Sequence, residues 1–336
     1  MPILRGFAPK ESRSNFVQAA PRVLITGSTG FVGRYLVPAL ASALPANAEI
    51  IAASHRGDNA VGDPKVRVIT LDVTSPEQVC AALADNAPSH LFHLAAVSAI
   101  PAAQQDIRHT WDINFGGTLN VALGILKHAP ECRLIYCSSA QVYGSSNPSK
   151  APIDEDAPLD PENVYAASKA AADVMIGQLT RQQLRAVRMR PFNHSGPGQN
   201  ENFVVPAFAA QIARIERGEQ EPIIRVGDLD SSRDFLDVRD VVDAYVRAVL
   251  RFDDLPARCV INIASGRAWS IRTILDILLG LSKKPIQVVQ DEKRMRAAET
   301  SVLTGSRDAA HRLLGWTPQT DFSMTLSAVL DHYRRL

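Results

Sequence analysis

The sequence has few cysteines, almost no net charge and no long apolar run. Four cysteines in 336 residues form no Cys-x-x-Cys pair, which excludes a disulfide framework and indicates a reducing compartment. A formal net charge of +1 provides no field strong enough to attract nucleic acid or an anionic membrane. Because no run of about 18 apolar residues exists, we expect no membrane-spanning helix. The reducing compartment that the cysteines indicate leads us to expect a cytoplasmic protein.

Length and composition bound the architecture. Apolar residues make up 46% of the chain and charged residues 21%, a balance that excludes a disordered protein. A chain of 336 residues can form one large domain or two modest ones. Residues 1–20 lack the continuous apolar stretch of a signal peptide, and we expect them to be a mobile arm rather than a transit peptide.

From residue 22 onward, short apolar runs rich in β-branched residues alternate with windows rich in alanine and leucine. A helix is predicted for residues 30–44. Strands are predicted at 23–26, 49–53, 66–69, 90–94, 133–136 and 186–189. Buried runs of this length, separated by helices, are typical of a parallel sheet that is covered on both faces. The sequence therefore predicts a doubly wound α/β fold of the Rossmann type.

The alternation stops after residue 190. Residues 190–202, RPFNHSGPGQNEN, are dense in turn-forming residues. A helix (205–217), a strand (259–263) and two more helices (271–281 and 308–314) are predicted to follow. We expect a dinucleotide-binding domain over residues 21–190, to which the chain returns near 233–264. Residues 191–232 and 265–336 are predicted to form a smaller substrate-binding lobe.

Three glycines follow the first predicted strand in the stretch TGSTGFVG, with the spacing G-x-x-G-x-x-G. Glycine there allows a tight backbone turn and lets a pyrophosphate approach the amino end of the next helix. The alternative is a simple strand–helix turn, but the position between strand and helix favours a nucleotide. Cofactor contacts are therefore predicted at Gly27, Thr29, Gly30, Phe31, Val32 and Gly33.

The end of the second strand bears on the choice of cofactor. It reads Ala-Ser-His-Arg-Gly over residues 53–57, with no carboxylate to bind a ribose 2′-hydroxyl. Ser54 and Arg56 favour a 2′-phosphate and hence NADP(H); the alternative is a solvated Arg56 and use of NAD(H) as well. Asp72, after the third strand, is a candidate to bind the adenine amino group or to cap the helix near Ser75.

The stretch DPENVYAASK predicts a helix with Asp160 as its N-cap and Pro161 in its first turn. Tyr165 and Lys169 lie four residues apart and so share one face of that helix. A nearby ammonium favours the phenolate, which brings the pKa of Tyr165 toward the operating pH and suits it to a carbonyl/alcohol pair. An isolated pair of this kind is more often on a surface, but its combination with the glycine motif favours catalysis.

These motifs resemble the extended short-chain dehydrogenase/reductase family, also known as the NAD-dependent epimerase/dehydratase family, which acts on nucleotide sugars. The resemblance covers residues 22 to the C-terminus. It implies that Ser139, in CSSAQVYG, is the third catalytic group beside Tyr165 and Lys169. It also implies a homodimer built on helices near 118–127 and 163–179. The cofactor contacts that it implies are Asp72, Val73, Leu94, Ala95, Ala96, Asn114, Tyr165, Lys169 and Phe192.

Three further stretches are similar to the GDP-4-keto-6-deoxy-D-mannose reductase group of that family: residues 190–199, 226–235 and 296–299. The related GDP-mannose dehydratases carry Arg-Pro-x-Glu at the last of these. Arginine suits a diphosphate, and Glu299 suits a ribose diol. Substrate contacts are thus implied at Gln141, Asn193, His194, Val204, Arg233, Arg296 and Glu299.

Gln141 bears on the type of reaction. Dehydratases of the family hold an acidic residue two places after the catalytic hydroxyl, and an amide cannot accept a proton at neutral pH. We therefore expect reduction of the C4 ketone of a GDP-linked 4-keto-6-deoxy sugar, with a GDP-rhamnose-type product, although glutamate is expected at this position in the reductases. A 4-epimerase, a 4,6-dehydratase and a protein that senses NADP(H) are the alternatives. His90 and His93 face opposite sides of a strand, so no metal is expected.

Overall fold

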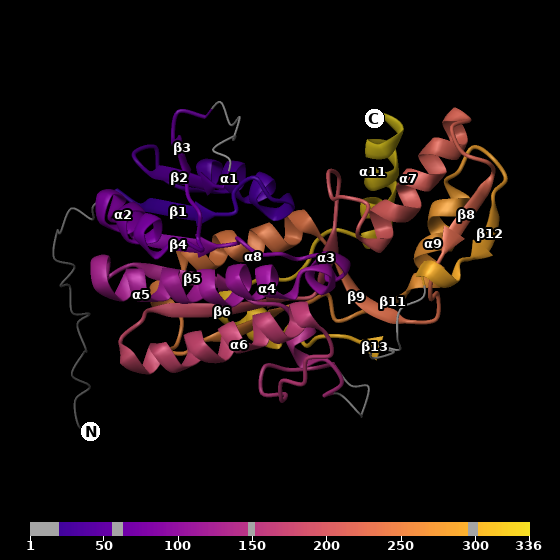
Figure 1. Ribbon diagram of the computed structural model, residues 1–336. Coiled ribbons are helices and arrows are strands. Elements are labelled where there is room, and N and C mark those ends of the chain that lie inside the picture. The colour runs from indigo at the N-terminus through magenta and orange to yellow at the C-terminus, as the bar shows by residue number, and fades with distance from the viewer. Residues whose placement is uncertain (1–19, 56–62, 147–151, 295–301) are drawn as a thin grey trace, which may run out of the picture.

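The computed structural model describes residues 20–55, 63–146, 152–294 and 302–336 (Figure 1). The predicted N-terminal arm therefore lies outside the described residues, apart from Ala20. Seven parallel strands form the main sheet, in the order β10-β6-β5-β4-β1-β2-β3. They are β1 (Arg22–Thr26), β2 (Glu49–Ser54), β3 (Val66–Thr70), β4 (His90–His93), β5 (Arg133–Cys137), β6 (Ala186–Pro191) and β10 (Val260–Ile263). This order confirms the predicted Rossmann fold.

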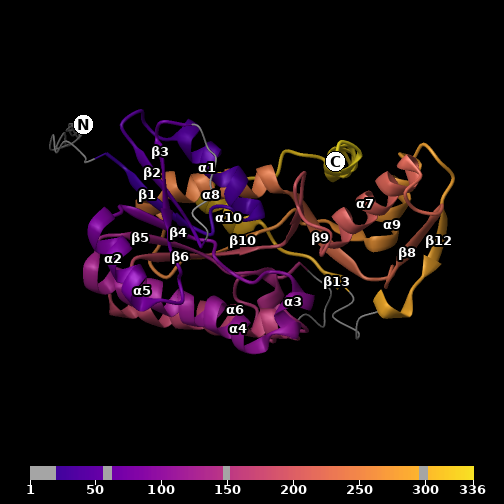
Figure 2. The ribbon, with the colours of Figure 1, turned by 45° about the horizontal axis from the view of Figure 1, so that its top comes forward.

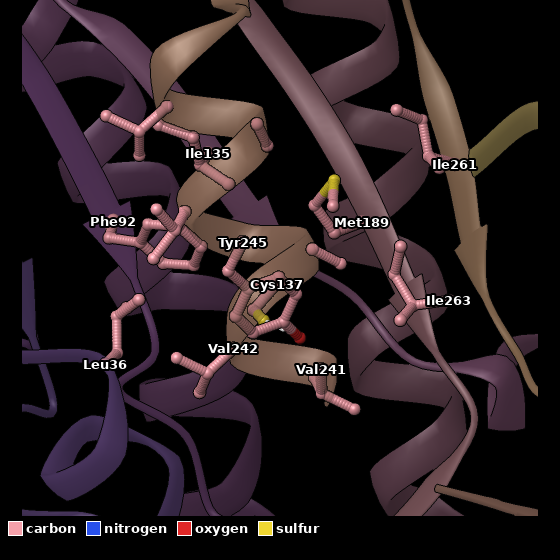
Figure 3. Close-up of a cluster of buried hydrophobic side chains, with 14 of the residues drawn as sticks. Leu36, Phe92, Ile135, Cys137, Met189, Val241, Val242, Tyr245, Ile261 and Ile263 are labelled. Carbon is pink, nitrogen blue, oxygen red and sulfur yellow. Dashed lines mark hydrogen bonds between the residues drawn. The ribbon is translucent and has the colours of Figure 1, made fainter. Parts of the chain in front are cut away.

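Helices cover both faces of this sheet (Figure 2). One face carries α1 (Phe31–Ala43), α8 (Val238–Leu250) and α10 (Asp308–Leu314). The other carries α2 (Pro76–Asn86), α5 (Thr118–His128) and α6 (Val164–Leu179). Since successive side chains of a strand point to opposite faces, the strands β1 to β6 contribute to both cores, whereas β10 contributes Ile261 and Ile263 to the first one. Figure 3 shows one of them, in which Tyr245 and Val242 of α8 pack over Phe92, Ile135 and Met189 of three strands.

The rest of the chain forms a smaller lobe at one end of the sheet domain (Figure 1, right). At its base, β9 (Ser232–Asp237) pairs with β7 (Asn193–Ser195), β11 (Ala268–Ser270) and β13 (Val302–Leu303). Beyond it, β8 (Ile223–Val226) pairs with β12 (Gln287–Gln290). The lobe has its own hydrophobic core, to which three helices contribute: α7 (Val204–Arg217), α9 (Ile271–Gly280) and α11 (Phe322–Arg334).

Short helical turns complete the described part of the chain. They are α3 (Ile100–Gln105), α4 (Ile107–Trp111), the π-helix η1 (Asp112–Gly117) and the 3₁₀ turns η2 (Ala140–Tyr143), η3 (Thr180–Gln182), η4 (Phe252–Asp254) and η5 (Glu292–Arg294). No helix in the described ranges has the length and apolar character needed to cross a membrane.

Two segments pack differently from their prediction. The turn-rich stretch 190–202 contains β7, which forms a strand because it pairs in parallel with β9, about forty residues later. Helix α10, predicted to belong to the lobe, packs on α8 and β10 of the sheet domain. Trp316 follows it into the same core and donates a hydrogen bond from Nε1 to the Asp240 carbonyl oxygen at 2.9 Å.

Two helix starts also differ from prediction. Helix α6 begins at Val164, with Asn163 as N-cap accepting from the Ala166 amide at 2.9 Å, so the predicted cap at Asp160 is wrong. Asp160 instead packs its carbonyl against Gly144, where a β-carbon would lie 1.7 Å from that oxygen. The N-cap of α2 is Ser75, which excludes the capping alternative for Asp72.

Candidate active site

A cleft of about 860 Å³ lies between the carboxyl ends of the main-sheet strands and the lobe. In an open α/β sheet this is the edge at which ligands bind. Most residues predicted for the site line it. They are Gly27, Gly30, Phe31, Val32, Gly33, Leu94, Ala96, Ser139, Gln141, Tyr165, Lys169, Phe192, Asn193, His194, Val204 and Arg233.

The glycine motif forms one end of this cleft. Gly27 adopts a φ of +68°, and a β-carbon there would lie 2.7 Å from the Ala95 amide nitrogen. A β-carbon on Gly33 would lie 2.4 Å from the Ser28 carbonyl oxygen. Gly30 is the N-cap of α1 and provides no side-chain cap, and the first turn of this helix carries no acidic residue. The first amides of α1 are thus left to bind an anion, which fits the pyrophosphate of a dinucleotide.

Ser139 and Tyr165 come together at the centre of the cleft. Ser139 follows β5 and is buried, and its hydroxyl is hydrogen bonded to the Tyr165 phenol. Burial raises the pKa of Tyr165 to about 12, and the hydrogen bond from Ser139 opposes that rise. The predicted lowering of this pKa by Lys169 is therefore wrong, because burial of the phenol has the larger effect. Tyr165 is protonated at neutral pH.

Lys169 lies one helical turn after Tyr165 and is buried. Its ammonium donates a hydrogen bond to the Cys137 carbonyl oxygen and lies 4.6 Å from the centre of the Tyr136 ring. Burial lowers the pKa of Lys169 to about 8, while Cys137 and Asp173 act in the opposite direction. The amine is thus charged at neutral pH and loses its proton in the mildly alkaline range.

A buried ion-pair network holds α6 against the sheet. Asp173 is fully buried and accepts hydrogen bonds from Nε and Nη2 of Arg190 and from Nη1 of Arg188, each at 2.9 Å. Arg190 also donates to the Tyr143 hydroxyl at 2.9 Å, and Tyr143 donates to Asn262 Oδ1 at 2.7 Å. The helix that carries Tyr165 and Lys169 is thereby linked to β6 and β10.

Asn114 lies beneath the cleft rather than in its wall. It sits in the π-helix η1 and is buried. Its Oδ1 accepts from the Val97 amide at 2.8 Å, and its Nδ2 donates to the Val97 carbonyl at 3.1 Å and to Ser168 Oγ at 3.0 Å. Asn114 therefore joins the loop after β4 to α6, and its predicted contact with the cofactor stays a prediction.

The other predicted residues fall into two groups. Thr29, Ser54, Asp72, Val73 and Ala95 do not line the cleft. Asp72 accepts hydrogen bonds from the Thr74 amide and hydroxyl, which lower its pKa, and its predicted bond to adenine stays a prediction. Arg56, Arg296 and Glu299 lie outside the described residues.

Three arginines that the sequence did not single out also line the cleft. Arg34 lies in the first turns of α1, directly after Gly33, and its position in the glycine motif could have revealed it. Arg225 of β8 and Arg294 of η5 come from the lobe. Nothing in their local sequence marks them, because only tertiary packing carries them to the cleft.

His194 lines the cleft between the cofactor and lobe ends. Its ring stacks on Phe31 with the ring centres 6.3 Å apart, and its Nδ1 shares a hydrogen bond with the Phe192 carbonyl oxygen at 2.9 Å. Burial lowers its pKa, so the imidazole is neutral at neutral pH. A neutral imidazole in this place can orient a ligand by hydrogen bonding.

A profile of the NAD dependent epimerase/dehydratase family matches residues 23–264. The chain belongs to this family. It is 35% identical to the GDP-6-deoxy-D-mannose reductase of Pseudomonas aeruginosa over 313 residues, which cover 93% of this chain and 97% of the relative. A UDP-glucose 4-epimerase of Streptomyces lividans is 30% identical over 241 residues, covering 68% and 70% of the two chains.

Solved structures agree with this membership. The structure of RMD from Pseudomonas aeruginosa complexed with NADPH matches with a TM-score of 0.78 and 33% identity, over 94% of this chain and 99% of that one. The family confirms the resemblance seen in the motifs and the prediction of an NAD(P)-dependent enzyme. The glycine motif and the open amides of α1 are the features of this chain that fit such a cofactor.

Proposed function

We propose that this protein catalyses the NAD(P)H-dependent reduction of the C4 ketone of a GDP-4-keto-6-deoxy-hexose, with a GDP-rhamnose-type product. The observation that carries this proposal is the single cleft that Ser139, Tyr165 and Lys169 share with the glycine motif. The reductase of Pseudomonas aeruginosa, which aligns over nearly the whole chain, supports the substrate class.

Each catalytic side chain has one task in this mechanism. When bound, the reduced nicotinamide supplies the hydride that C4 receives. Tyr165 donates its proton to the carbonyl oxygen, which becomes the alcohol oxygen, and Ser139 hydrogen-bonds that same oxygen. A phenol whose pKa is raised to about 12 holds its proton until the oxygen develops charge, as a general acid must. The Lys169 ammonium, which is charged at neutral pH, is proposed to contact the nicotinamide ribose.

Gln141 favours reduction over dehydration. It lines the cleft two residues after Ser139, where an amide cannot remove a proton from the sugar. Two carboxylates of the described residues also line the cleft. Glu201 is ion-paired with Arg214, and Asp228 accepts a hydrogen bond from the Asp230 amide. These contacts do not place either carboxylate to act as the base that removes a proton from the sugar.

A nucleotide-sugar 4-epimerase is the second candidate, and it is favoured by the epimerase of Streptomyces lividans among the relatives. Epimerases use the same catalytic set, so these three residues do not separate the two activities. The net consumption of NADPH separates them, because an epimerase returns the hydride to its substrate and leaves no net change in NADPH.

We extend the proposal to NADP(H) as the preferred cofactor and to the substrate contacts. Arg34 is exposed in the cleft one residue after Gly33, and we propose that its guanidinium binds the 2′-phosphate that distinguishes NADP(H) from NAD(H). Asn193 and His194 are proposed to orient the sugar. Arg233 and Arg225, on the lobe side, are proposed to bind the diphosphate of GDP.

A homodimer and a cytoplasmic location complete the proposal. Leu123 of α5 and Val174 of α6 are 49% and 58% exposed, and large apolar side chains on two neighbouring helices support an interface between two copies. The four cysteines are free thiols, as is usual in a reducing compartment.

The proposal is tested by supplying the 4-keto-6-deoxy sugar nucleotide with NADPH and measuring NADPH oxidation together with the product. The reductase consumes one NADPH for each sugar reduced. Tyr165→Phe is expected to bind NADPH normally and to lose about 10²–10⁴-fold in turnover, the usual contribution of a general acid. Sugar interconversion without net NADPH loss would establish the epimerase instead. Binding of NADPH without any turnover would indicate a sensor.

A further inference from the structure

Residues 193–203 form one wall of the cleft, here called the cleft-wall segment. It consists of β7 and the turn that leads into α7, and most of its residues line the cleft. The segment joins the two parts of the molecule, because β6 of the main sheet precedes it and α7 of the lobe follows it. Its shape therefore affects both ends of the cleft.

Two tyrosine hydroxyls hold this segment from opposite sides. Tyr35, on α1 of the sheet domain, donates a hydrogen bond to the Pro197 carbonyl oxygen at 2.7 Å. Tyr333, in the last turn of α11 in the lobe, donates to the Gln199 carbonyl oxygen at 2.7 Å, in a buried position. Neither tyrosine lines the cleft. Each hydroxyl can therefore influence a ligand only through the backbone carbonyl to which it donates.

The segment is also braced internally. The side chain of Gln199 is buried, accepts from Ser195 Oγ at 2.8 Å and donates to the His194 carbonyl oxygen at 3.1 Å. A displacement of the backbone at residue 199 is thereby passed to His194, which lines the cleft. The anchored turn and the ligand-facing strand β7 act as one unit.

Both anchors are themselves firmly placed. Helix α11 is fixed to the sheet domain, because Thr325 donates to the buried Asp237 carboxylate, the N-cap of α8, at 2.8 Å. On the other side, Phe31 packs edge-on against Tyr35, with ring centres 5.7 Å apart. The same Phe31 stacks on His194. The cleft-wall segment is thus held between two rigid helices.

We propose that Tyr35 and Tyr333 are positioning residues that hold the cleft-wall segment in the shape that binds the nucleotide sugar. The inference rests on the proposed function for the identity of that ligand. Removing either hydroxyl leaves a carbonyl without its donor and loosens the wall. The expected rise in KM for the nucleotide sugar is about fivefold, the factor that corresponds to the net contribution of one typical hydrogen bond.

The experiment compares Tyr35→Phe, Tyr333→Phe, the double variant and the wild type. For each protein, kcat, KM for the nucleotide sugar, Kd for NADPH and Tm are measured, and Kd for GDP is measured by calorimetry. Each single variant is expected to raise KM and the GDP Kd about fivefold, with kcat and the NADPH Kd within about twofold of wild type. The double variant is expected to lose less than the product of the two effects, since both hydroxyls act on one segment.

The Tyr35→Phe variant gives the most decisive comparison between binding of the sugar nucleotide and binding of NADPH. Tyr35 belongs to α1, whose amino end is proposed to bind the pyrophosphate of the cofactor, yet its variant should weaken binding of the sugar nucleotide and not of NADPH. Ser327→Ala is the matched control, because it removes a hydroxyl from α11 at a half-buried position and should leave all constants unchanged.

Three results would overturn the inference: an unchanged KM and GDP Kd in folded variants, a fall in kcat at constant KM, or weaker NADPH binding by Tyr35→Phe. Should Tyr333→Phe not fold, the Tyr35 variant decides the question alone. A wild type that fails to oxidise NADPH with the ketone refutes the proposed function, and the GDP affinities of the same variants then still test the role of the two tyrosines.

Discussion

Asp173 provides a quantitative test of how the catalytic helix is held. It has no exposed surface, and its partners Arg190 and Arg188 are only 5% and 15% exposed. Asp173→Ala would leave a buried guanidinium without its counter-ion and remove three hydrogen-bond acceptor contacts. Breaking a buried pair in this way typically lowers the free energy of unfolding by about 3–5 kcal/mol. At about 2 °C per kcal/mol for a chain of this size, Tm should fall by about 6–10 °C.

The matched control is an exposed ion pair. Arg108 and Asp112 lie four residues apart on the surface, with side chains 89% and 48% exposed. Asp112→Ala should change the free energy of unfolding by about 0.5 kcal/mol or less, because solvent screens the pair. Thermal unfolding of both variants at neutral pH measures the difference, and Asp173→Asn should fall between them.

The pH dependence gives a second check of the same argument. Burial raises the pKa of Asp173, but the hydrogen bond and charge of Arg190 outweigh it, so the pKa is lowered overall. The stabilisation is therefore complete above the unfolded pKa of about 3.8 and is lost as pH falls through the folded pKa below that value. The difference in Tm between wild type and Asp173→Asn should narrow only in strong acid.

A Tm for Asp173→Ala equal to that of Asp112→Ala would refute the inference that the buried ion pairs of Asp173 stabilise the fold.

Three further predictions concern the cofactor and the catalytic amine. Gly33→Ala should weaken NADPH binding at least about tenfold in fluorescence titration, since its β-carbon would meet the Ser28 carbonyl oxygen at 2.4 Å. The control Gly280→Ala, whose β-carbon would meet no described atom beyond the local helix backbone within 4 Å, should leave NADPH binding unchanged. Equal NADPH affinities of the two variants would contradict the assignment of the glycine motif to the cofactor. Because burial lowers the pKa of Lys169 to about 8, kcat/KM for reduction should fall as pH rises through about 8, and a profile flat to about pH 10 would exclude a role for the ammonium. Arg34→Ala should raise KM for NADPH about tenfold and leave KM for NADH nearly unchanged. An equal rise of KM for both cofactors would show that Arg34 does not bind the 2′-phosphate.

Features that depend on neighbouring residues could be predicted from the sequence. The buried strands were visible because a short β-branched run between helical windows suits few other structures. The glycine motif could be recognised because it lies directly between a strand and a helix, and the Tyr165–Lys169 pair because four residues make one helical turn. These local signals were enough for the Rossmann fold and for the centre of the cleft.

Features that join distant residues could be assigned only from the folded molecule. The pKa of Tyr165 rises because many remote atoms bury the phenol, and a spacing of four residues carries no information about burial. Asn163 rather than Asp160 caps α6, and the Asp160 carbonyl packs against Gly144. Tyr333 reaches Gln199 across 134 residues of sequence, a contact that exists only once α11 has docked. The physical reason is that burial and long-range pairing are properties of the packed molecule. Caps, turns and periodicity depend first on neighbouring residues, and tertiary packing then preserves them or replaces them.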